Sequence, residues 1–389
     1  MSLSIPPFRA DVVGSYLRPN YLHDARRQFA AGQLTQQQLT DVEDQAITEL
    51  VARQKAVGLQ VITDGEFRRS WWHLDFMWGI HGVEKSEIEQ GYLFAQIETR
   101  PESIRLTGKI SGEHHPFLEH FRFLMQFVEE GVVPRLTIPA PAQFLKELQR
   151  PCNLEQTQAI YPNESDLLDD IVLVYQTFIR ELYAVGCRNL QIDDCTWGML
   201  TDPKIAAIAA KASTPREATC GCGDSHEFDH TQSIAGLTEK LLLVNNRALA
   251  NAPVDLILTT HVCRGNYRST WAASGGYAPI ADVLFAKENV SAFYLEFDTD
   301  RSGDFSPLAK VPQDKQVVLG LVSSKTGELE DKDEVITRIH EAAQYVPLEN
   351  LCLSTQCGFA STEEGNELSE EQQWQKITLV KEIAKQVWG

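Results

Sequence analysis

Short apolar runs alternate with longer amphipathic segments along this chain. The runs are rich in β-branched and aliphatic residues, and several are too apolar to alternate, which is typical of buried parallel strands. We predict eight strands, at 8–14, 60–63, 135–138, 189–192, 256–260, 292–295, 316–321 and 351–354. Helical periodicity fills the intervals, as in 35–56, 117–130, 164–184, 233–250, 331–344 and 370–387.

Eight strands that alternate with helices favour a closed (β/α)8 barrel, the TIM barrel, over an open doubly wound sheet. We therefore predict that residues 1–389 form a single barrel domain with two insertions. The first, at about 66–113, is too long for one helix, and its runs LFAQIETR and SIRLTGKIS predict a β-hairpin after strand 2. The second, at about 214–231, is polar and rich in Gly, Cys and His.

The charge balance narrows the range of partners. Thirty-five basic residues against 54 acidic ones give a formal net charge of -19, which disfavours nucleic acid and anionic membrane surfaces. No apolar run approaches the roughly 18 residues of a spanning helix, and the N-terminus does not resemble a secretion signal, so we expect a cytoplasmic protein. Eight scattered cysteines in a reducing compartment are core residues, metal ligands or nucleophiles.

Polar groups follow the predicted strands, at the end of the barrel where active sites lie. They are Gly14 and Ser15, the TDGEFRR stretch at 63–69, Asp193 and Asp194, the HVC stretch at 261–263, the EFD stretch at 296–298, the SSK stretch at 323–325, and Gln356 with Cys357. We therefore expect the functional side chains among them.

Four of these residues suggest a metal site. His261 and Cys263 are two apart in extended chain and can face one centre, while Glu296 and Cys357 follow the sixth and eighth strands. A buried cysteine after a strand is more often packing than a ligand, but two sulfurs, an imidazole and a carboxylate together favour catalytic zinc. A zinc ion with two thiolates suits activation of a substrate thiol better than that of water, and Glu296 would be the displaceable ligand.

A rival zinc site is conceivable in CGCGDSHEFDH, which contains Cys220, Cys222, His226 and His230. The Cys-Gly-Cys spacing is tighter than usual, and the segment belongs to the second insertion rather than to a strand end. It would be a structural site.

The motifs GSY, DGE, QIDD, HVC, LEFD and QCGF, in this order, resemble the C-terminal catalytic barrel of the cobalamin-independent methionine synthase family and its shorter single-barrel relatives. The resemblance implies a homocysteine S-methyltransferase of methionine biosynthesis that binds zinc through His261, Cys263, Glu296 and Cys357. It also implies that Ser15, Glu66 and Asp193 bind the homocysteine carboxylate and amine. Glu296, Asp193 and Glu66 are then the predicted catalytic groups, although a carboxylate at 193 or 194 is also a common helix cap.

Three departures concern the methyl donor. The chain has no room for a second barrel, GLVSSKTGELE offers Lys325 where the family has a histidine, and IPAPAQFLKEL lacks the tryptophan expected to stack on folate. Trp71, Trp72, Phe76 and Trp78 could stack on a pterin instead, but such a stretch is as often a lid core or a subunit contact. The donor is therefore either a 5-methyltetrahydrofolate type or another methyl compound.

Two other functions fit the residues. The same zinc site with another thiol would give an epoxide:thiol transferase or a methylthio demethylase. A protein without metal would be a decarboxylase-like barrel or a binding module for small amino acids. In the leading hypothesis the partners are homocysteine and a methyl donor, with neither nucleic acid nor membrane, and a homo-oligomer is possible.

Overall fold

The computed structural model describes residues 5–95, 97–204 and 234–389. Six strands in these ranges form one parallel sheet in the order β12–β11–β10–β9–β8–β7. Their bounds are β7 Leu136–Pro139, β8 Asn189–Asp193, β9 Ile257–Val262, β10 Ala292–Glu296, β11 Gln316–Val322 and β12 Leu351–Thr355. Sheet neighbours are consecutive in the chain, so each connection crosses back outside the sheet, as expected for an α/β fold.

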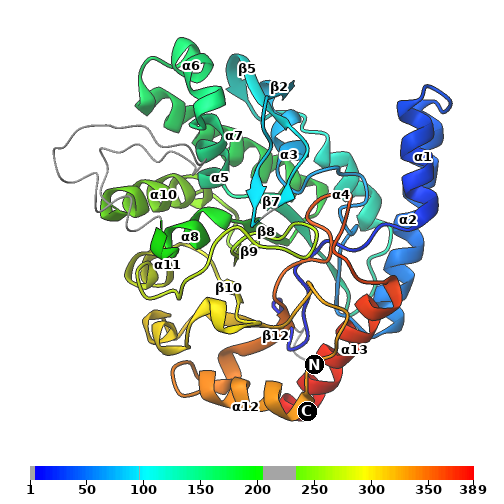
Figure 1. The fold of residues 1–389 in the computed structure, drawn as a ribbon, viewed down its shortest axis with the longest axis vertical. Helices are drawn as coiled ribbons and strands as arrows, with labels where there is room; N and C mark the ends of the chain where they lie inside the picture. Colours follow the sequence, from blue (N-terminus) through cyan, green and yellow to red (C-terminus); the bar gives the residue numbers. More distant parts are fainter. Residues whose placement is uncertain (1–4, 96, 205–233) are drawn as a thin grey trace.

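Helices lie around the strands (Figure 1), and in the described ranges four of the five connections within the sheet contain an α-helix, whereas β10 and β11 are joined through two short 3-10 turns. The helices around the strands are α1 Asn20–Ala30, α2 Gln36–Ala56, α4 Phe117–Met125, α5 Pro141–Leu148, α6 Pro151–Ile160, α7 Glu164–Val185, α8 Cys195–Leu200, α10 Ile234–Leu249, α11 Ala281–Lys287, α12 Lys332–Ala342 and α13 Glu370–Trp388. Two helices begin with a capping box, which Thr35 and Gln38 form at the start of α2 and Ser369 and Gln372 form at the start of α13.

Two further segments extend the parallel arrangement. Strand β1 (Val61–Ile62) pairs in parallel with β6 (Val133–Pro134), which leads almost directly into β7. Segment 8–14, the predicted first strand, makes one parallel bridge, between Ala10 and Leu353 of β12. The Asp11 amide donates to the Leu353 carbonyl, while the Asp11 carboxylate accepts hydrogen bonds from the amides of Phe8 and Val12. The arrangement is compatible with a barrel.

The chain between β1 and β6 contains α3 (Leu74–Trp78) and an antiparallel pair of β2 (His81–Glu87) with β5 (Glu102–Ser111). The predicted run SIRLTGKIS is thus part of β5, but its partner is 81–87 rather than LFAQIETR. That run instead contributes the short pair β3 (Leu93–Phe94) and β4 (Ile97–Glu98). The predicted insertion at 214–231 lies outside the described residues.

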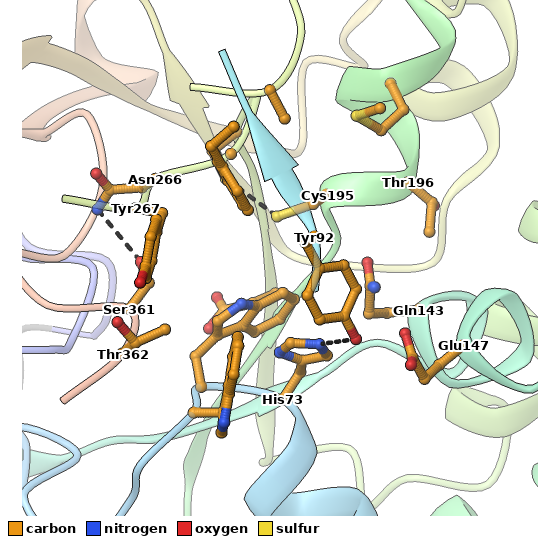
Figure 2. A pocket seen from close by; sticks show the side chains of 18 of the residues that line it. His73, Tyr92, Gln143, Glu147, Cys195, Thr196, Asn266, Tyr267, Ser361 and Thr362 are labelled. Atoms are coloured by element: carbon orange, nitrogen blue, oxygen red, sulfur yellow. Dashed lines mark hydrogen bonds between the residues drawn. The ribbon is translucent and has the colours of Figure 1, made fainter. Parts of the chain in front are cut away.

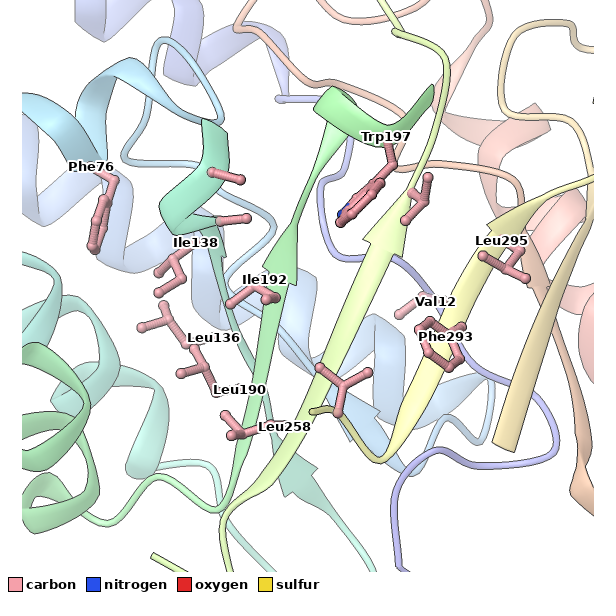
Figure 3. Close-up of a cluster of buried hydrophobic side chains, with 14 of the residues drawn as sticks. Val12, Phe76, Leu136, Ile138, Leu190, Ile192, Trp197, Leu258, Phe293 and Leu295 are labelled. Atoms are coloured by element: carbon pink, nitrogen blue, oxygen red, sulfur yellow. The ribbon is translucent and has the colours of Figure 1, made fainter. Parts of the chain in front are cut away.

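Apolar side chains fill the space between the strands and the helices (Figure 3). All residues of β7, β8, β10 and β12 are buried, which explains why these segments lack alternation. Leu190 and Ile192 of β8 and Leu258 of β9 belong to this core. No helix in the described ranges combines the length and apolar character needed to cross a membrane.

Candidate metal and substrate site

Three predicted metal ligands come together at the carboxyl ends of the strands. His261 lies in β9, Cys263 follows it, and Cys357 lies two residues beyond β12; all three are buried. Their donor atoms lie within 4.8 Å of one another. Both ring nitrogens of His261 are buried without a hydrogen-bond partner, which is unusual for an imidazole unless a ligand completes it. Two sulfurs and an imidazole suit zinc, so these residues fit the predicted metal.

The fourth predicted ligand, Glu296, ends β10 and is fully buried, but it is not a member of this group of donor atoms. Its Oε2 accepts a hydrogen bond of 2.7 Å from the Arg264 amide, and its Oε1 pairs with Arg301 and lies 3.9 Å from Lys325 Nζ. Burial raises the pKa of Glu296, but the charges of Lys325, Arg301 and Arg264 outweigh it and lower that pKa overall. The carboxylate is therefore ionised and held by cations.

Two buried carboxylates lie in the same pocket. Glu66 Oε1 accepts a hydrogen bond of 2.7 Å from Thr137 Oγ1 and lies 3.3 Å from Arg69, while its Oε2 is buried without a hydrogen-bond partner. Asp193 Oδ1 accepts a bond of 2.8 Å from Gln191. Burial raises the pKa of both acids, and the charge of Glu66 raises that of Asp193 further. Among the described residues Glu66 forms an ion pair with Arg69 and Asp193 forms none, and burial outweighs the nearby arginine charges in the pKa of both acids.

The turn that carries Glu66 is conformationally demanding. Gly65 and Glu66 both have positive φ, of 66° and 61°, and the second value is uncommon for a residue with a side chain. Arg18 holds this turn, since its guanidinium donates to the Glu66 carbonyl at 2.8 Å. Ser15, also predicted from the sequence, is buried, lines the same pocket and accepts a bond of 3.3 Å from the Ala360 amide. Strain of this kind is typical of functional sites.

A single pocket joins these groups to an aromatic wall (Figure 2). The wall is made by Trp71, Trp72, His73, Tyr92, Phe94 and Tyr267. His73 and Tyr92 are hydrogen-bonded at 3.2 Å, and the rings of Phe94 and Tyr267 lie 5.5 Å apart. The pocket therefore contains thiols, carboxyl groups and a wall of aromatic rings that are tilted relative to one another.

The aromatic stretch after β1 divides between two roles. Trp71 and Trp72 line the pocket, whereas Phe76 is fully buried and stacks on His115 at 4.4 Å between ring centres. Trp78 donates to the Ser103 carbonyl on β5 and does not line the pocket. The packing alternative therefore holds for Phe76 and Trp78.

Asp193 and Asp194 also differ. Asp194 caps α8, because its side chain accepts from the Thr196 amide at 3.0 Å. Asp193 faces the pocket instead. The capping alternative is thus confirmed for Asp194, and the rival ligands Cys220, Cys222, His226 and His230 lie outside the described residues.

Sequence reasoning did not select Cys195, although it begins α8 directly after β8 and also lines the pocket. Its Sγ lies 3.1 Å from Cys263 Sγ, and Figure 2 shows its side chain directed into the pocket. Its position could have been noticed in the sequence, because Cys195 follows a predicted strand in QIDDC, as the other selected residues follow theirs.

Comparisons with known proteins agree on one family. Residues 8–95 match the catalytic domain of cobalamin-independent synthases. The uncharacterized protein YxjH of Bacillus subtilis is 44% identical over 98% of this chain and 95% of its own. The crystal structure of a putative vitamin-B12 independent methionine synthase from Listeria monocytogenes has a TM-score of 0.73 and 35% identity, covering 99% of both chains. A B12-independent methionine synthase structure from Shewanella sp. W3-18-1 shares the fold, with a TM-score of 0.68 and 16% identity over 97% of both chains.

Proposed function

The chain belongs to the family of cobalamin-independent methionine synthases, and on this premise we propose that it is a zinc-dependent methyltransferase that forms methionine from homocysteine. The methyl donor would be a 5-methyltetrahydrofolate or a related methyl compound. The observation that carries the proposal is the single pocket in which His261, Cys263 and Cys357 lie with the buried carboxyl groups of Glu66 and Asp193.

The metal would be held by His261, Cys263 and Cys357, whose donor atoms already lie close together. Bound zinc lowers the pKa of a thiol that reaches it, so that the thiol reacts as a thiolate. Glu296 is the fourth ligand predicted from the sequence. To act as one, its carboxylate would exchange contacts with Arg301 and the Arg264 amide.

The carboxylate end of the pocket fits an amino acid. Burial keeps the pKa of both Glu66 and Asp193 raised although arginines lie near, and the ammonium group of an amino acid would stabilise their ionised forms. Ser15 would bind the substrate carboxylate, as the resemblance implies. With its amine at these acids, an amino acid whose side chain ends in a thiol would extend toward the sulfurs of Cys263 and Cys357.

The aromatic wall fits a flat methyl donor. Offset stacking on Trp72, Tyr92 or Tyr267 would hold a pterin ring in the pocket that contains the thiol, and would keep water away from it. The role of the aromatic residues would be to position the methyl donor and to exclude water from the pocket. The reacting methyl group and the thiol sulfur must approach in line, and two neighbouring subsites in one pocket favour that alignment.

We include closure of the barrel in the same proposal. Segment 8–14 contacts β12 through Ala10, and just beyond it the Tyr16 amide donates to the Gly65 carbonyl at 3.1 Å. These contacts support closure of residues 1–389 as one (β/α)8 barrel. Such a methyltransferase would work in the cytoplasm, alone or as a homo-oligomer.

Metal analysis and thiol binding test the proposal. Purified protein should hold about one zinc per chain, and calorimetry should show homocysteine binding with release of a proton. Cys263→Ser should lose zinc and weaken homocysteine binding, whereas the control Cys152→Ser, at an exposed position outside the lining of the pocket, should not.

Product analysis with homocysteine and 5-methyltetrahydrofolate should then show methionine. Zinc-free active protein, or homocysteine affinity unchanged in Cys263→Ser, would overturn the proposal. Turnover only with another thiol in a panel of small thiols would replace homocysteine as the substrate and keep the zinc.

A further inference from the structure

His73 brings a polar nitrogen to the aromatic wall of the pocket. The residue directly precedes α3 and is only 4% exposed, yet its side chain lines the pocket. That side chain makes no capping bond to α3, and its Nδ1 is buried with no hydrogen-bond partner among the described residues. Such an atom is costly to bury unless a bound group completes it. Nδ1 of His73 is therefore a candidate contact for a ligand.

The other ring nitrogen of His73 belongs to a buried chain of hydrogen bonds. Its Nε2 lies 3.2 Å from the hydroxyl oxygen of Tyr92, whose hydroxyl group is also hydrogen-bonded to the Glu147 side chain (Figure 2). Glu147, on α5, accepts further bonds from Ser103 Oγ at 2.9 Å and from Arg150 at 3.0 Å. Burial raises the pKa of Glu147, but the charge of Arg150 and the bonds that the carboxylate accepts lower it overall. Glu147 is therefore ionised.

The ionised carboxylate determines where the protons of this chain lie. A carboxylate only accepts hydrogen bonds, so the single hydroxyl proton of Tyr92 points to Glu147. The Tyr92 oxygen is then the acceptor for His73, and the proton of the imidazole lies on Nε2. Burial also lowers the pKa of His73 to about 4, so the ring is neutral at pH 7 and has no second proton. Nδ1 therefore presents a lone pair and can only accept a hydrogen bond.

Backbone contacts hold both members of this pair at the wall. The Trp72 amide donates to the Ser361 carbonyl at 2.8 Å, and the Tyr92 amide donates to Thr99 Oγ1 at 2.8 Å. The ring centres of Trp72 and His73 lie 4.6 Å apart, with 34° between the ring planes. The acceptor nitrogen is thus fixed beside an indole ring on which a planar ligand could stack.

We propose that His73 is a specificity residue for the methyl donor, whose ring donates a hydrogen bond from an N–H group to Nδ1, and that Tyr92 and Glu147 hold His73 in the accepting tautomer. The inference rests on the proposed function. A pterin ring has N–H groups at its edge, so it can stack on the wall and donate to His73 at the same time. A methyl compound without an N–H group on a flat ring would not gain this bond.

Nitrogen-15 NMR of the histidine rings tests the tautomer in the zinc-loaded wild-type chain. The His73 signals, identified by their loss in His73→Asn, should show a proton on Nε2 and none on Nδ1. Addition of 5-methyltetrahydrofolate in the presence of homocysteine should shift the Nδ1 signal in the direction of a hydrogen-bonded acceptor. A protonated Nδ1 in the unliganded chain, or an Nδ1 signal that bound 5-methyltetrahydrofolate leaves unchanged, would overturn the inference and leave the proposed function standing.

Two substitutions separate the acceptor from the ring. His73→Phe keeps an aromatic ring but removes the acceptor, and it should weaken the binding of 5-methyltetrahydrofolate about tenfold, the loss expected for one hydrogen bond. In His73→Asn the side-chain oxygen can lie near the position of Nδ1, so this variant should bind within about threefold of the wild type. The control is His340→Asn, at an exposed position outside the lining of the pocket. Zinc content and homocysteine affinity should be unchanged in all three variants.

The binding results distinguish this inference from the proposed function. Wild-type affinity for 5-methyltetrahydrofolate in His73→Phe would overturn the inference, and so would a loss in His73→Asn as large as that in His73→Phe. A wild-type chain that binds zinc and homocysteine but not 5-methyltetrahydrofolate would also overturn it, while the zinc-bound thiol acceptor would stand. A chain that binds none of the three would overturn both.

Discussion

The burial of Glu288 leads to a quantitative prediction of how the stability of the protein depends on pH. It follows α11 directly and is fully buried. One oxygen accepts a hydrogen bond of 2.8 Å from Asn245, whose amide also donates to Asp194, and the other oxygen has no hydrogen-bond partner. Burial, followed by the charge of Asp194, raises the pKa of Glu288 from 4.5 to about 8. The Glu288→Gln substitution keeps the size and the acceptor but removes the titration.

Proton linkage determines whether stability rises or falls with pH. A folded-state pKa above the unfolded value means that the folded protein binds the proton more tightly, so stability is full below pH 4.5 and is lost as the pH rises through about 8. For a shift from 4.5 to about 8, the loss from Glu288 is about 1 kcal/mol at pH 5, about 3 kcal/mol at pH 7 and about 4 kcal/mol at pH 8. Glu288→Gln should not show this loss.

Urea denaturation at pH 5, 7 and 8 measures this loss of stability. The free energy of unfolding of Glu288→Gln minus that of the wild type should increase by about 3 kcal/mol between pH 5 and pH 8. Any fixed cost of placing a buried amide at this position cancels in that comparison. A difference that stays constant within about 0.5 kcal/mol would refute the reasoning, because the wild-type carboxyl would then not be held neutral by burial.

Two other substitutions test the site. Asp193→Asn should weaken homocysteine binding at least about tenfold and abolish the preference for homocysteine over 4-mercaptobutyrate, which lacks the amine; calorimetry measures both. The same variant should melt at a higher temperature than the wild type at pH 8, because burial and the charge of Glu66 raise the pKa of Asp193 and its ionisation costs stability as the pH rises; an equal or lower melting temperature would contradict this. Gly198→Ala should destabilise the protein by about 1–3 kcal/mol and lower its zinc affinity, since the new Cβ would push α8 away from Cys263; chelator competition and urea denaturation check this, and wild-type zinc affinity would show that the contact is not needed.

Much of the fold was predictable because buried parallel strands have a local signature. The strands β8 to β12 begin and end within two residues of the apolar runs. Segment 8–14 was predicted as a strand, but it makes a single parallel bridge, and the amides of Phe8 and Val12 donate to the Asp11 side chain, which the hydrophobic pattern does not reveal. The partner of β5 was predicted wrongly because strand pairing depends on contacts between segments, and 81–87 does not have the alternation that LFAQIETR has.

The candidate site was predictable to the extent that strand ends determine it. His261, Cys263 and Cys357 follow from that rule, and the structure brings them together. The partners of Glu296 do not follow from it, since Arg301 and Lys325 come from the segments that follow two different strands.

The sequence by itself determined the α/β class, the order of the strands and the residue types at their carboxyl ends. These are local properties, written in apolar runs and in the polar residues that follow them. Only the tertiary structure decided which donors lie within reach of one another. Cys195 and Cys263 are 68 residues apart, and their 3.1 Å separation depends on how closely a short helix packs against the end of a strand. A distance of that kind is set by backbone contact between remote segments, so no local pattern contains it.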